Sequence, residues 1–308
     1  MKLIVGVDVG GTTCKIGVFD TEGNLQKKWE LFTNKKDNGE HVMSDIYKSL
    51  LQKKVNLDDV LGYGFGVPGP VVNGTVLRAV NIGWPEKDLA LEFSQLVGNS
   101  NVHVGNDANV AALGESFKGA AKGKKDIAMI TLGTGIGGGI IVDGHRIDGV
   151  FGAGGEIGHI VCHSDHPREC NCGSIGCLET IASATGIKRE FKYLLKHTDL
   201  KTSIKDVSRP SAKKIFAAAE NGDELSNAVI DEVARVLGYA CHIISLMTNP
   251  EVIVFGGGVS RAGEFLFEKI RREFKKYKFH AAQYTKIVGA ELGNDAGMYG
   301  AAYMVTNA

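Results

Sequence analysis

The sequence is poor in the features that mark several classes of protein. Among its 308 residues only 6 are proline and 6 are cysteine, and 35 basic residues are balanced by 35 acidic ones. The zero balance excludes a generally basic nucleic-acid binder, although a local basic patch is not excluded. The longest uncharged apolar run, 127–142, is rich in glycine and shorter than the ~20 apolar residues of a spanning helix. Because Met1 leads directly into a strand-like segment with no signal peptide, we expect a soluble cytoplasmic protein without membrane or nucleic-acid partners.

The few cysteines are unevenly spread. Cys170, Cys172 and Cys177 fall within one short glycine-containing stretch, whereas a disulfide framework would space its cysteines through the chain. Such clustering in a cytosolic protein points to metal binding or catalysis, the alternative being a redox-active or inert thiol cluster. Three thiolates need one further ligand to complete a tetrahedral zinc site. The candidates for that ligand are His159, which is the best placed, Cys162, His163 and His166.

Glycine, by contrast, is abundant, with 41 residues gathered in clusters. Residues 3–20 read LIVGVDVGGTTCKIGVFD and residues 127–143 read IAMITLGTGIGGGIIVD. Both segments read as strand, glycine-rich turn and strand, and a constant offset aligns them. The sequence therefore predicts an internal duplication in which each half opens with an antiparallel meander.

After the meanders, strands alternate with helices. Apolar residues spaced by three and four predict helices, and short apolar runs that end at glycine or proline predict strands. We expect strands at 61–67, 102–104 and 251–255, helices at 89–97, 107–117, 224–247 and 264–277, and a final helix capped by Asp295. The result is an α/β protein with two related lobes and a central cleft, a smaller lobe of residues 1–117 and a larger one of 118–293. The C-terminal segment 294–308 is expected to pack back onto the first lobe.

The two duplicated turns have the chemistry of a phosphate site. Successive backbone N–H groups in a glycine-rich turn form a concavity that binds anions, and threonine hydroxyls add donors. Asp8 ends the first strand, where its carboxylate can hold a magnesium ion or its waters. Neither turn matches a P-loop, and the segment after Gly138 continues as a strand, which excludes a dinucleotide-binding turn. The alternative is an ordinary tight hairpin.

These motifs carry a resemblance. Residues 8–13 (DVGGTT), 132–139 (LGTGIGGG), 155–159 (GEIGH) and 170–179 (CNCGSIGCLE) are similar to those of the actin-like, ribonuclease H-like superfamily of sugar kinases. Within it, the chain resembles the ROK family of repressors, open reading frames and kinases. The matches run in order over nearly the whole chain, and the cysteine motif is the most specific. The resemblance implies a homodimer in which His159 joins the three cysteines on a structural zinc ion.

Asp107 has two interpretations. It opens a predicted helix after a short strand, a position at which aspartate is commonly just a helix cap. The resemblance instead assigns it the role of general base, taking the proton of a sugar hydroxyl as that oxygen attacks the γ-phosphoryl group.

The resemblance also implies the remaining ligand contacts. The positions that match sugar-contacting residues are Asn81, Asn106, Asp107, Glu156, His159 and Glu179. The positions expected to bind ATP and Mg²⁺ are Asp8, Gly10, Gly11, Thr12, Thr13, Lys15, Gly133, Thr134, Gly135, Gly256, Gly257 and Gly258. An exposed lysine and a plain strand-to-helix turn are the simpler explanations for Lys15 and for residues 256–258.

The expected function is ATP-dependent phosphorylation of a hexose, and the form of residues 81–84 (NIGW) favours glucose. Kinases of fructose, allose, N-acetylglucosamine or N-acetylmannosamine are alternatives within the same class, and ADP or polyphosphate are alternative donors. A sugar-sensing repressor of this family would carry an N-terminal winged helix, for which no room precedes the strand at residue 3. A non-catalytic sugar-binding protein is the third alternative.

Overall fold

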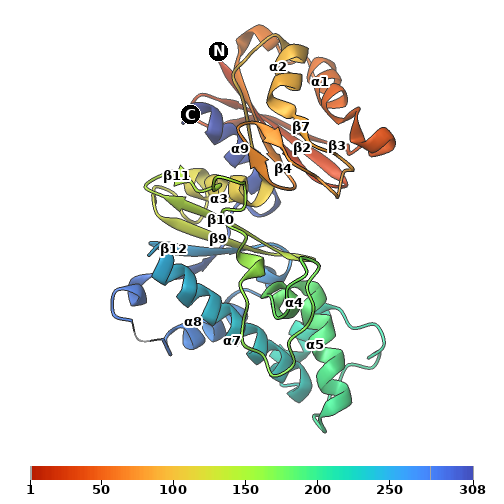
Figure 1. Cartoon of the computed structure of the whole chain (residues 1–308), viewed down its shortest axis with the longest axis vertical. Coiled ribbons are helices and arrows are strands. Elements are labelled where there is room, and N and C mark those ends of the chain that lie inside the picture. The colour runs from red at the N-terminus through yellow and green to blue at the C-terminus, as the bar shows by residue number, and fades with distance from the viewer. Residues whose placement is uncertain (1, 278, 308) are drawn as a thin grey trace. The chain divides into compact units, whose positions relative to one another are not determined.

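The computed structural model describes residues 2–277 and 279–307 and has a mixed α/β fold (Figure 1). The chain forms two compact units. Unit 1 comprises Met1–Lys125, Gly139–Gly155 and Glu291–Ala308, and unit 2 comprises Asp126–Gly138 and Glu156–Ala290. Met1, Lys278 and Ala308, which fall within the predicted lobes and C-terminal segment, lie outside the described residues. In the described part of the chain, no helix has the length and apolar character needed to cross a bilayer.

Unit 1 is built on a five-stranded sheet with the order β3-β2-β1-β4-β8. Its strands are β1 (Leu3–Val9), β2 (Thr13–Asp20), β3 (Leu25–Phe32), β4 (Val60–Val67) and β8 (Val102–Asn106). Its helices are α1 (Val42–Gln52), α2 (Leu89–Val97), α3 (Asp107–Lys118) and α9 (Ala296–Thr306), and β5 (Val71–Val72), β6 (Thr75–Val76) and β7 (Lys87–Asp88) form a small second sheet. The first three strands pair antiparallel, whereas β1, β4 and β8 are parallel.

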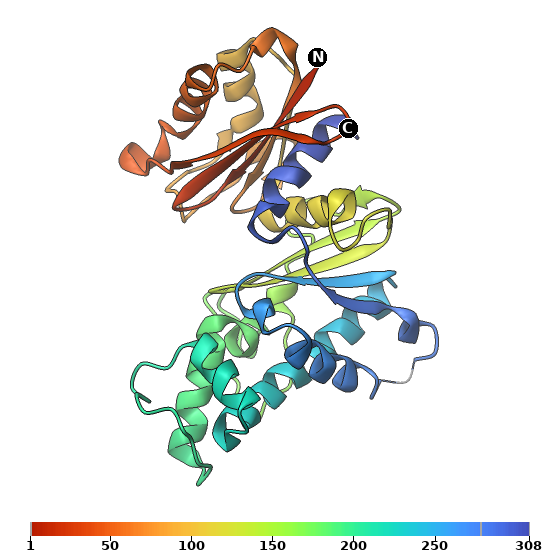
Figure 2. The same ribbon diagram turned by 180° about the vertical axis from the view of Figure 1, so that it is seen from behind.

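Alternation along the strands gives the large sheet of unit 1 two apolar faces. Val5 and Val7 of β1 pack with α1 and α2, whereas the preceding Ile4, on the opposite face, packs with Met298 of α9. The two views of the ribbon show α1 and α2 on one side of this sheet and α9 on the other (Figures 1 and 2). Because both faces are covered, β1 reads as a nearly continuous apolar run.

Two glycines let α9 approach this sheet closely. A Cβ atom on Gly6 would lie 2.1 Å from the Met298 carbonyl oxygen, and one on Gly64 would lie 1.8 Å from that of Ala301. Both distances are far inside van der Waals contact, and both clashes are with backbone atoms. Any side chain at these positions would therefore push the helix off the sheet.

We expect Gly64→Ala to lower the free energy of unfolding by at least about 2 kcal/mol, because the helix backbone has to move to accept the added methyl group. Denaturant titration followed by circular dichroism measures this loss. Gly66→Ala, on the same strand, is the matched control, since its Cβ would meet only Val110 side-chain carbons at 3.3 Å and the Asp107 Cα at 3.6 Å. Equal losses in the two variants would contradict the argument.

The second five-stranded sheet has the order β11-β10-β9-β12-β13. Its strands are β9 (Ile127–Leu132), β10 (Ile136–Val142), β11 (His145–Arg146), β12 (Val252–Gly256) and β13 (Lys286–Gly289), and the division between the units falls within β10. The helices of unit 2 are α4 (Glu179–Ala182), α5 (Ala184–His197), α6 (Ala212–Glu220), α7 (Glu224–Met247) and α8 (Glu264–Phe274). β12 pairs in parallel with β9 and β13, and all its residues are buried, which explains its unbroken apolar sequence.

The two sheets confirm the predicted duplication, because their strand orders correspond position by position and β1–β2 and β9–β10 are the aligned segments. The predicted helices at 89–97 and 224–247 are α2 and α7 to the residue. Other predicted bounds differ from the observed ones; β8, for example, continues to Asn106 rather than ending at residue 104. α8 ends at Phe274 rather than at residue 277, and the Asp295 side chain does not cap α9 but accepts a 2.6 Å hydrogen bond from the Lys28 ammonium.

Candidate functional site

The glycine turn of unit 1 joins β1 to β2. Within it the Gly10 N–H donates to the Thr13 carbonyl at 3.0 Å, and the Thr33 hydroxyl donates to the Gly10 carbonyl at 2.6 Å. The Gly10 N–H is therefore engaged inside the turn, which leaves the anion-binding role to the residues that follow. Thr12 at the tip is exposed, and the Gly11 backbone lies against Asn81, which the sequence had placed near the sugar.

Asp8 lies at the end of β1, in a neighbourhood of charges. Burial raises the pKa of its carboxyl from 3.8 to about 6, the negative charge of Asp107 acts in the same direction, and Lys15 acts against it. The Lys15 ammonium donates a 2.6 Å hydrogen bond to the Asn294 carbonyl. A partly buried aspartate beside a second one is an oxygen donor set that suits Mg²⁺.

Asp8→Asn is expected to stabilise the ligand-free protein at neutral and higher pH. Because the folded-state pKa is raised, ionising Asp8 costs folding free energy, and this cost grows as pH rises from about 4 to about 7. The free energy of unfolding of the variant should exceed that of the parent by on the order of 1–2 kcal/mol at about pH 8, and the difference should vanish towards pH 4. Urea titrations at both pH values check this, with Asp58→Asn, an exposed aspartate, as the control. A difference independent of pH would contradict it.

Asn106, and not Asp107, caps α3. The Asn106 side-chain oxygen accepts hydrogen bonds from the N–H groups of Ala108 at 3.0 Å and Asn109 at 3.3 Å, and its amide nitrogen donates to the Gly69 carbonyl at 3.1 Å. Asp107 is the first residue of the helix, and its carboxylate also accepts from the Ala108 N–H at 2.8 Å. Asn106 therefore supplies the cap and keeps one amide hydrogen for a ligand, while one Asp107 oxygen shares the Ala108 N–H with it.

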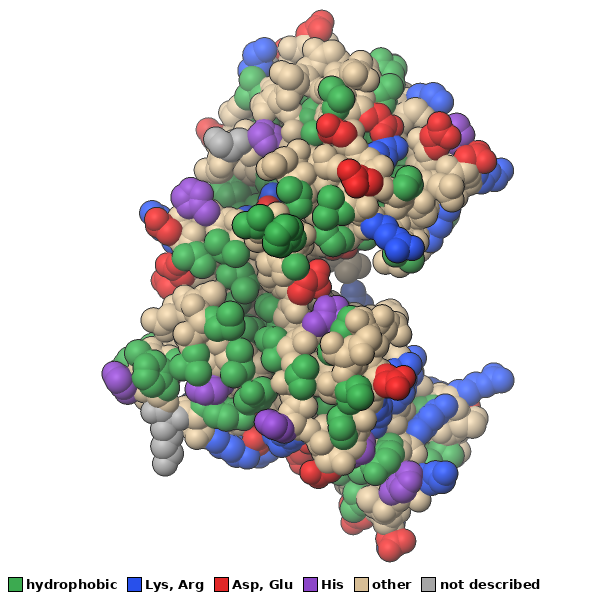
Figure 3. All heavy atoms as spheres, in the orientation of Figure 1, with side chains coloured by type: hydrophobic (Ala, Val, Ile, Leu, Met, Phe, Trp, Pro, Cys, Tyr) green, Lys and Arg blue, Asp and Glu red, His purple; other side chains and the backbone are tan. Residues whose placement is uncertain are grey.

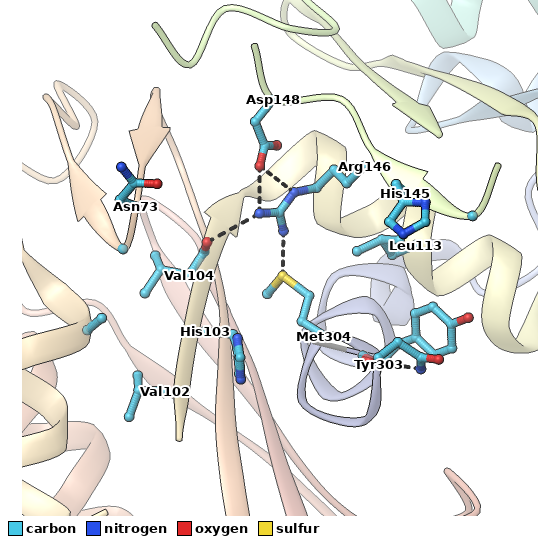
Figure 4. Close-up of a pocket in the computed structure, with 14 residues that line it drawn as sticks. Asn73, Val102, His103, Val104, Leu113, His145, Arg146, Asp148, Tyr303 and Met304 are labelled. Atoms are coloured by element: carbon cyan, nitrogen blue, oxygen red, sulfur yellow. Dashed lines mark hydrogen bonds and ion pairs between the residues drawn. The ribbon is translucent and has the colours of Figure 1, made fainter. Parts of the chain in front are cut away.

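A polar chain that the sequence did not reveal ties α3 to the loop after β11. The buried Asn109 amide donates to Asp148 at 3.1 Å and to the Gly154 carbonyl at 3.2 Å. The Arg146 guanidinium binds Asp148 at 2.6–2.7 Å and lines a cavity of about 430 Å³ together with Met304 (Figure 4). None of the predicted site residues lines this cavity. These polar contacts instead hold the loop at residues 148–154 against α3, the helix that begins with Asp107.

In unit 2, the glycine turn between β9 and β10 is held by α4 and α5. The Glu179 carboxylate accepts a 2.8 Å hydrogen bond from the Ile136 N–H, and a Cβ on Gly135 would lie 2.1 Å from the same carboxylate. The Ala184 N–H at the start of α5 donates to the Gly133 carbonyl at 2.9 Å. Glu179, predicted as a sugar contact, thus has a structural task at this turn through one of its oxygens.

The structure brings the glycine turn after β12 beside that after β9. Gly257 has a φ of +87°, and a Cβ there would lie 2.5 Å from the Leu132 carbonyl oxygen, so only glycine allows this approach. Gly133, Thr134 and Gly258 line one pocket of about 650 Å³, a volume typical of small-molecule sites. Its other lining residues include Leu132, Phe216, Val259 and Ala262, with Lys213, Glu220 and Arg261 as charged neighbours.

Sequence reasoning missed the contribution of α6 to this pocket. Ser211 caps α6 by accepting a hydrogen bond from the Lys214 N–H, and the helix then presents Phe216 and Ala217 to the pocket. The signal was present, since a serine precedes a short run of good helix formers. Apolar side chains beside a backbone N–H turn suit a molecule with a flat base and a phosphate chain.

The cysteine loop forms a compact cluster with one histidine. The ligand atoms of His159, Cys170, Cys172 and Cys177 all lie within 4.8 Å of one another. The Cys170 sulfur is 3.6 Å from His159 Nδ1, and the sulfurs of Cys172 and Cys177 are 3.6 Å apart. A tetrahedral zinc site with Zn–S bonds near 2.3 Å has edges of about 3.8 Å, so these four side chains fit zinc. Four protein ligands would close the coordination sphere, which is the arrangement of a structural site.

The other candidates for the fourth ligand are excluded or engaged elsewhere. His166 Nε2 contacts the buried Glu190 carboxylate at 2.8 Å, and Arg168 binds the same carboxylate at 2.7 Å. Cys162 is buried outside the cluster, and burial raises its pKa to about 11. His163 is likewise outside the group of ligand atoms. The Arg168–Glu190–His166 contacts instead anchor the loop to α5.

Charge in the cluster is unevenly distributed. Hydrogen bonds with the backbone and side chain of Ser174 lower the pKa of Cys172 to about 6, whereas burial raises that of Cys177 to about 12. A zinc ion would stabilise all three thiolates together. His159 presents Nδ1 to the thiols, and its Nε2 lies 3.9 Å from the Glu156 carboxylate. The histidine therefore links the cluster to a residue that the sequence assigned to the sugar.

The comparisons with known proteins place the chain in a family. The model of the ROK family matches residues 4–308. The chain is a member of the ROK family. It is 42% identical to the glucokinase of Halalkalibacterium halodurans, covering 98% of this chain and 94% of that protein, and 36% identical to that of Thermotoga maritima, covering 98% and 96%. The crystal structure of a ROK family glucokinase from Streptomyces griseus in complex with glucose and AMPPNP matches with a TM-score of 0.77 at 34% identity, over 99% of this chain and 100% of that one. The fold class predicted for this ROK protein is thereby confirmed.

Proposed function

We propose that this ROK protein transfers the γ-phosphoryl group of ATP to a hexose, specifically to the 6-hydroxyl of D-glucose. The observation that supports this most is the full-length likeness to a glucokinase crystallised with glucose and AMPPNP. The substrate assignment is further supported by the 42% identity to a second glucokinase.

The nucleotide assignment is supported by the pocket of unit 2. Adenosine would lie among Leu132, Phe216 and Val259, beside the backbone of residues 256–258. We assign the phosphates to N–H groups and hydroxyls of residues 11–13 and 133–135, with Lys15 as a nearby positive charge. Asp8 would hold the Mg²⁺ that accompanies ATP, directly or through water. Magnesium supplies charge neutralisation on the phosphate oxygens when it is bound.

The acceptor side of the reaction is assigned to the groups around Asp107. As the sugar hydroxyl oxygen bonds to the γ-phosphorus and the bond to ADP breaks, the hydroxyl proton moves to the Asp107 carboxylate. In unit 1 the sugar would contact Asn81 and the remaining amide hydrogen of Asn106. In unit 2 we assign sugar contacts to Glu156, to His159 Nε2 and to the Glu179 oxygen that does not accept from Ile136.

A coupled assay of ADP release with a panel of sugars tests this proposal. We expect ADP release that depends on glucose and on Mg²⁺-ATP, with little release in the absence of sugar. Faster turnover of N-acetylglucosamine, N-acetylmannosamine, fructose or allose than of glucose would show that the substrate assignment is wrong and that the kinase activity is right. If no hexose in the panel promotes ADP release, the proposed activity is wrong. Light scattering of the same preparation tests the expected homodimer.

A further inference from the structure

A second concave site in unit 2 is lined by positive charge. We call it the basic groove; it has a volume of about 340 Å³ and is lined by Thr185, Lys188, Arg189, Lys192, Ser208, Arg209 and Pro210. The side chains at 185, 188, 189 and 192 share one face of α5, since they are three, four and seven positions apart. Ser208 and Arg209 come from the loop before α6. Two segments of the chain therefore converge on one groove with four cations and two hydroxyls.

The charge of this region contrasts with that of the whole chain. The sequence carries no net charge, yet between residues 188 and 214 nine basic residues stand against three acidic ones. They are Lys188, Arg189, Lys192, Lys196, Lys201, Lys205, Arg209, Lys213 and Lys214 against Glu190, Asp199 and Asp206. Figure 3 shows blue side chains gathered at its lower right, over α5 and the loop that follows it. Such a local excess is an electrostatic site for anions.

The nearby acidic groups leave the groove cationic. Glu190 is buried and already binds Arg168 and His166. Asp206 accepts hydrogen bonds from the Ser208 hydroxyl at 2.6 Å and from the Arg209 N–H at 3.3 Å, so its contacts hold the loop. Among the described residues, no carboxylate forms an ion pair with any of the four cationic side chains of the groove.

We propose that the basic groove binds the phosphate groups of a small phosphorylated metabolite. Arginine donates pairs of hydrogen bonds that match phosphate oxygens, and the lysine ammonium groups and the Thr185 hydroxyl add further donors, whereas the Ser208 hydroxyl donates to Asp206. The volume suits a small molecule rather than an extended strand, and no aromatic side chain lines the groove on which a nucleobase could stack. The groove also lacks the large apolar side chains by which a protein surface enters a membrane.

The basic groove is distinct from the pocket of about 650 Å³, although the two are neighbours in the chain. Ala184 and Ala212 line that pocket, and Thr185 and Pro210 line the groove. The groove has no glycine-rich turn and no apolar wall for a base. Its occupant is therefore recognised by phosphate charge, and a titration has to be made with the neighbouring pocket filled.

Calorimetric titration with inorganic pyrophosphate, in saturating AMPPNP and at constant ionic strength, tests the proposal. We expect one pyrophosphate per chain, and we expect Arg189→Gln combined with Arg209→Gln to weaken its affinity at least about tenfold. Lys196→Gln combined with Lys201→Gln removes the same charge from the same stretch outside the groove and should change the affinity little. Equal weakening of pyrophosphate affinity in both double variants, or no weakening in the first, would show that the basic groove is not the binding site. Tighter binding of a single-stranded RNA or of anionic vesicles than of pyrophosphate would overturn the choice of ligand.

Discussion

Replacing Asp107 with asparagine is expected to lower the turnover of sugar phosphorylation by about 10²–10⁴-fold, the usual contribution of a general base, while leaving sugar affinity nearly unchanged. The proposed step needs a group that accepts the hydroxyl proton during attack. An amide of the same shape cannot accept that proton at neutral pH, but it can keep the hydrogen bonds that a ground-state sugar makes. The loss should therefore fall on kcat rather than on sugar binding.

The geometry at the start of α3 makes this substitution a clean test. Asn106 satisfies the first N–H groups of the helix, and the amide introduced by Asp107→Asn would retain an oxygen for the Ala108 N–H, from which the Asp107 carboxylate accepts at 2.8 Å. Helix stability should consequently be unaffected, in contrast to the cost of about 1 kcal/mol for losing a cap.

Steady-state kinetics for turnover and calorimetry for glucose affinity measure the two quantities separately. Asp58→Asn, an exposed carboxylate-to-amide change elsewhere in unit 1, is the control and should keep full turnover. Turnover within a fewfold of the parent in Asp107→Asn would remove Asp107 from the mechanism. A loss of glucose affinity as large as the loss of turnover would make it a binding residue instead.

The parts of the fold that were predictable are those with a repeated local pattern. α7 shows apolar residues at helical spacing over its whole length, and β1–β2 and β9–β10 are marked by their duplicated glycine turns. α5 and α6 were not predicted, although α5 has 14 residues and the side chains of Ser183 and Ser211 cap the two helices. The prediction that Asp295 caps α9 was wrong because of a tertiary contact: its carboxylate binds Lys28 of β3 instead of the N–H groups of the helix.

The candidate site divides in the same way. Residues that belong to a motif, such as the three cysteines or Asp107, could be named from the sequence. The hydrogen bonds that hold the side chains around the site could not be predicted, because their partners come from distant segments of the chain. Glu179 bonds to the Ile136 N–H, and Asn109 bonds to Asp148, across separations that no periodicity encodes.

Loss of zinc is expected to weaken glucose binding by at least about tenfold, or 1.4 kcal/mol, without abolishing the fold of unit 1. The physical reason is the position of His159, whose Nδ1 lies at the thiols and whose Nε2 lies 3.9 Å from Glu156. Without the ion, the three thiols and the imidazole have no common partner, so the loop between residues 159 and 177 is released. Glu156 and Glu179, which flank that loop, then lose their fixed orientation.

Cys172→Ser tests this with little disturbance of packing, because Cys172 is exposed whereas Cys177 is fully buried. We expect elemental analysis to find one zinc per chain in the parent and none or little in the variant, with glucose affinity reduced in parallel. Cys162→Ala is the matched control from the same loop, since Cys162 lies outside the cluster and should leave both zinc content and affinity intact. Zinc restored to the chelated parent should recover the glucose affinity. Because a closed site of four protein ligands has no open coordination position for a water molecule, the pH profile of turnover should not change. A metal-free parent that binds glucose as tightly as the zinc form would show that the cluster does not serve the sugar.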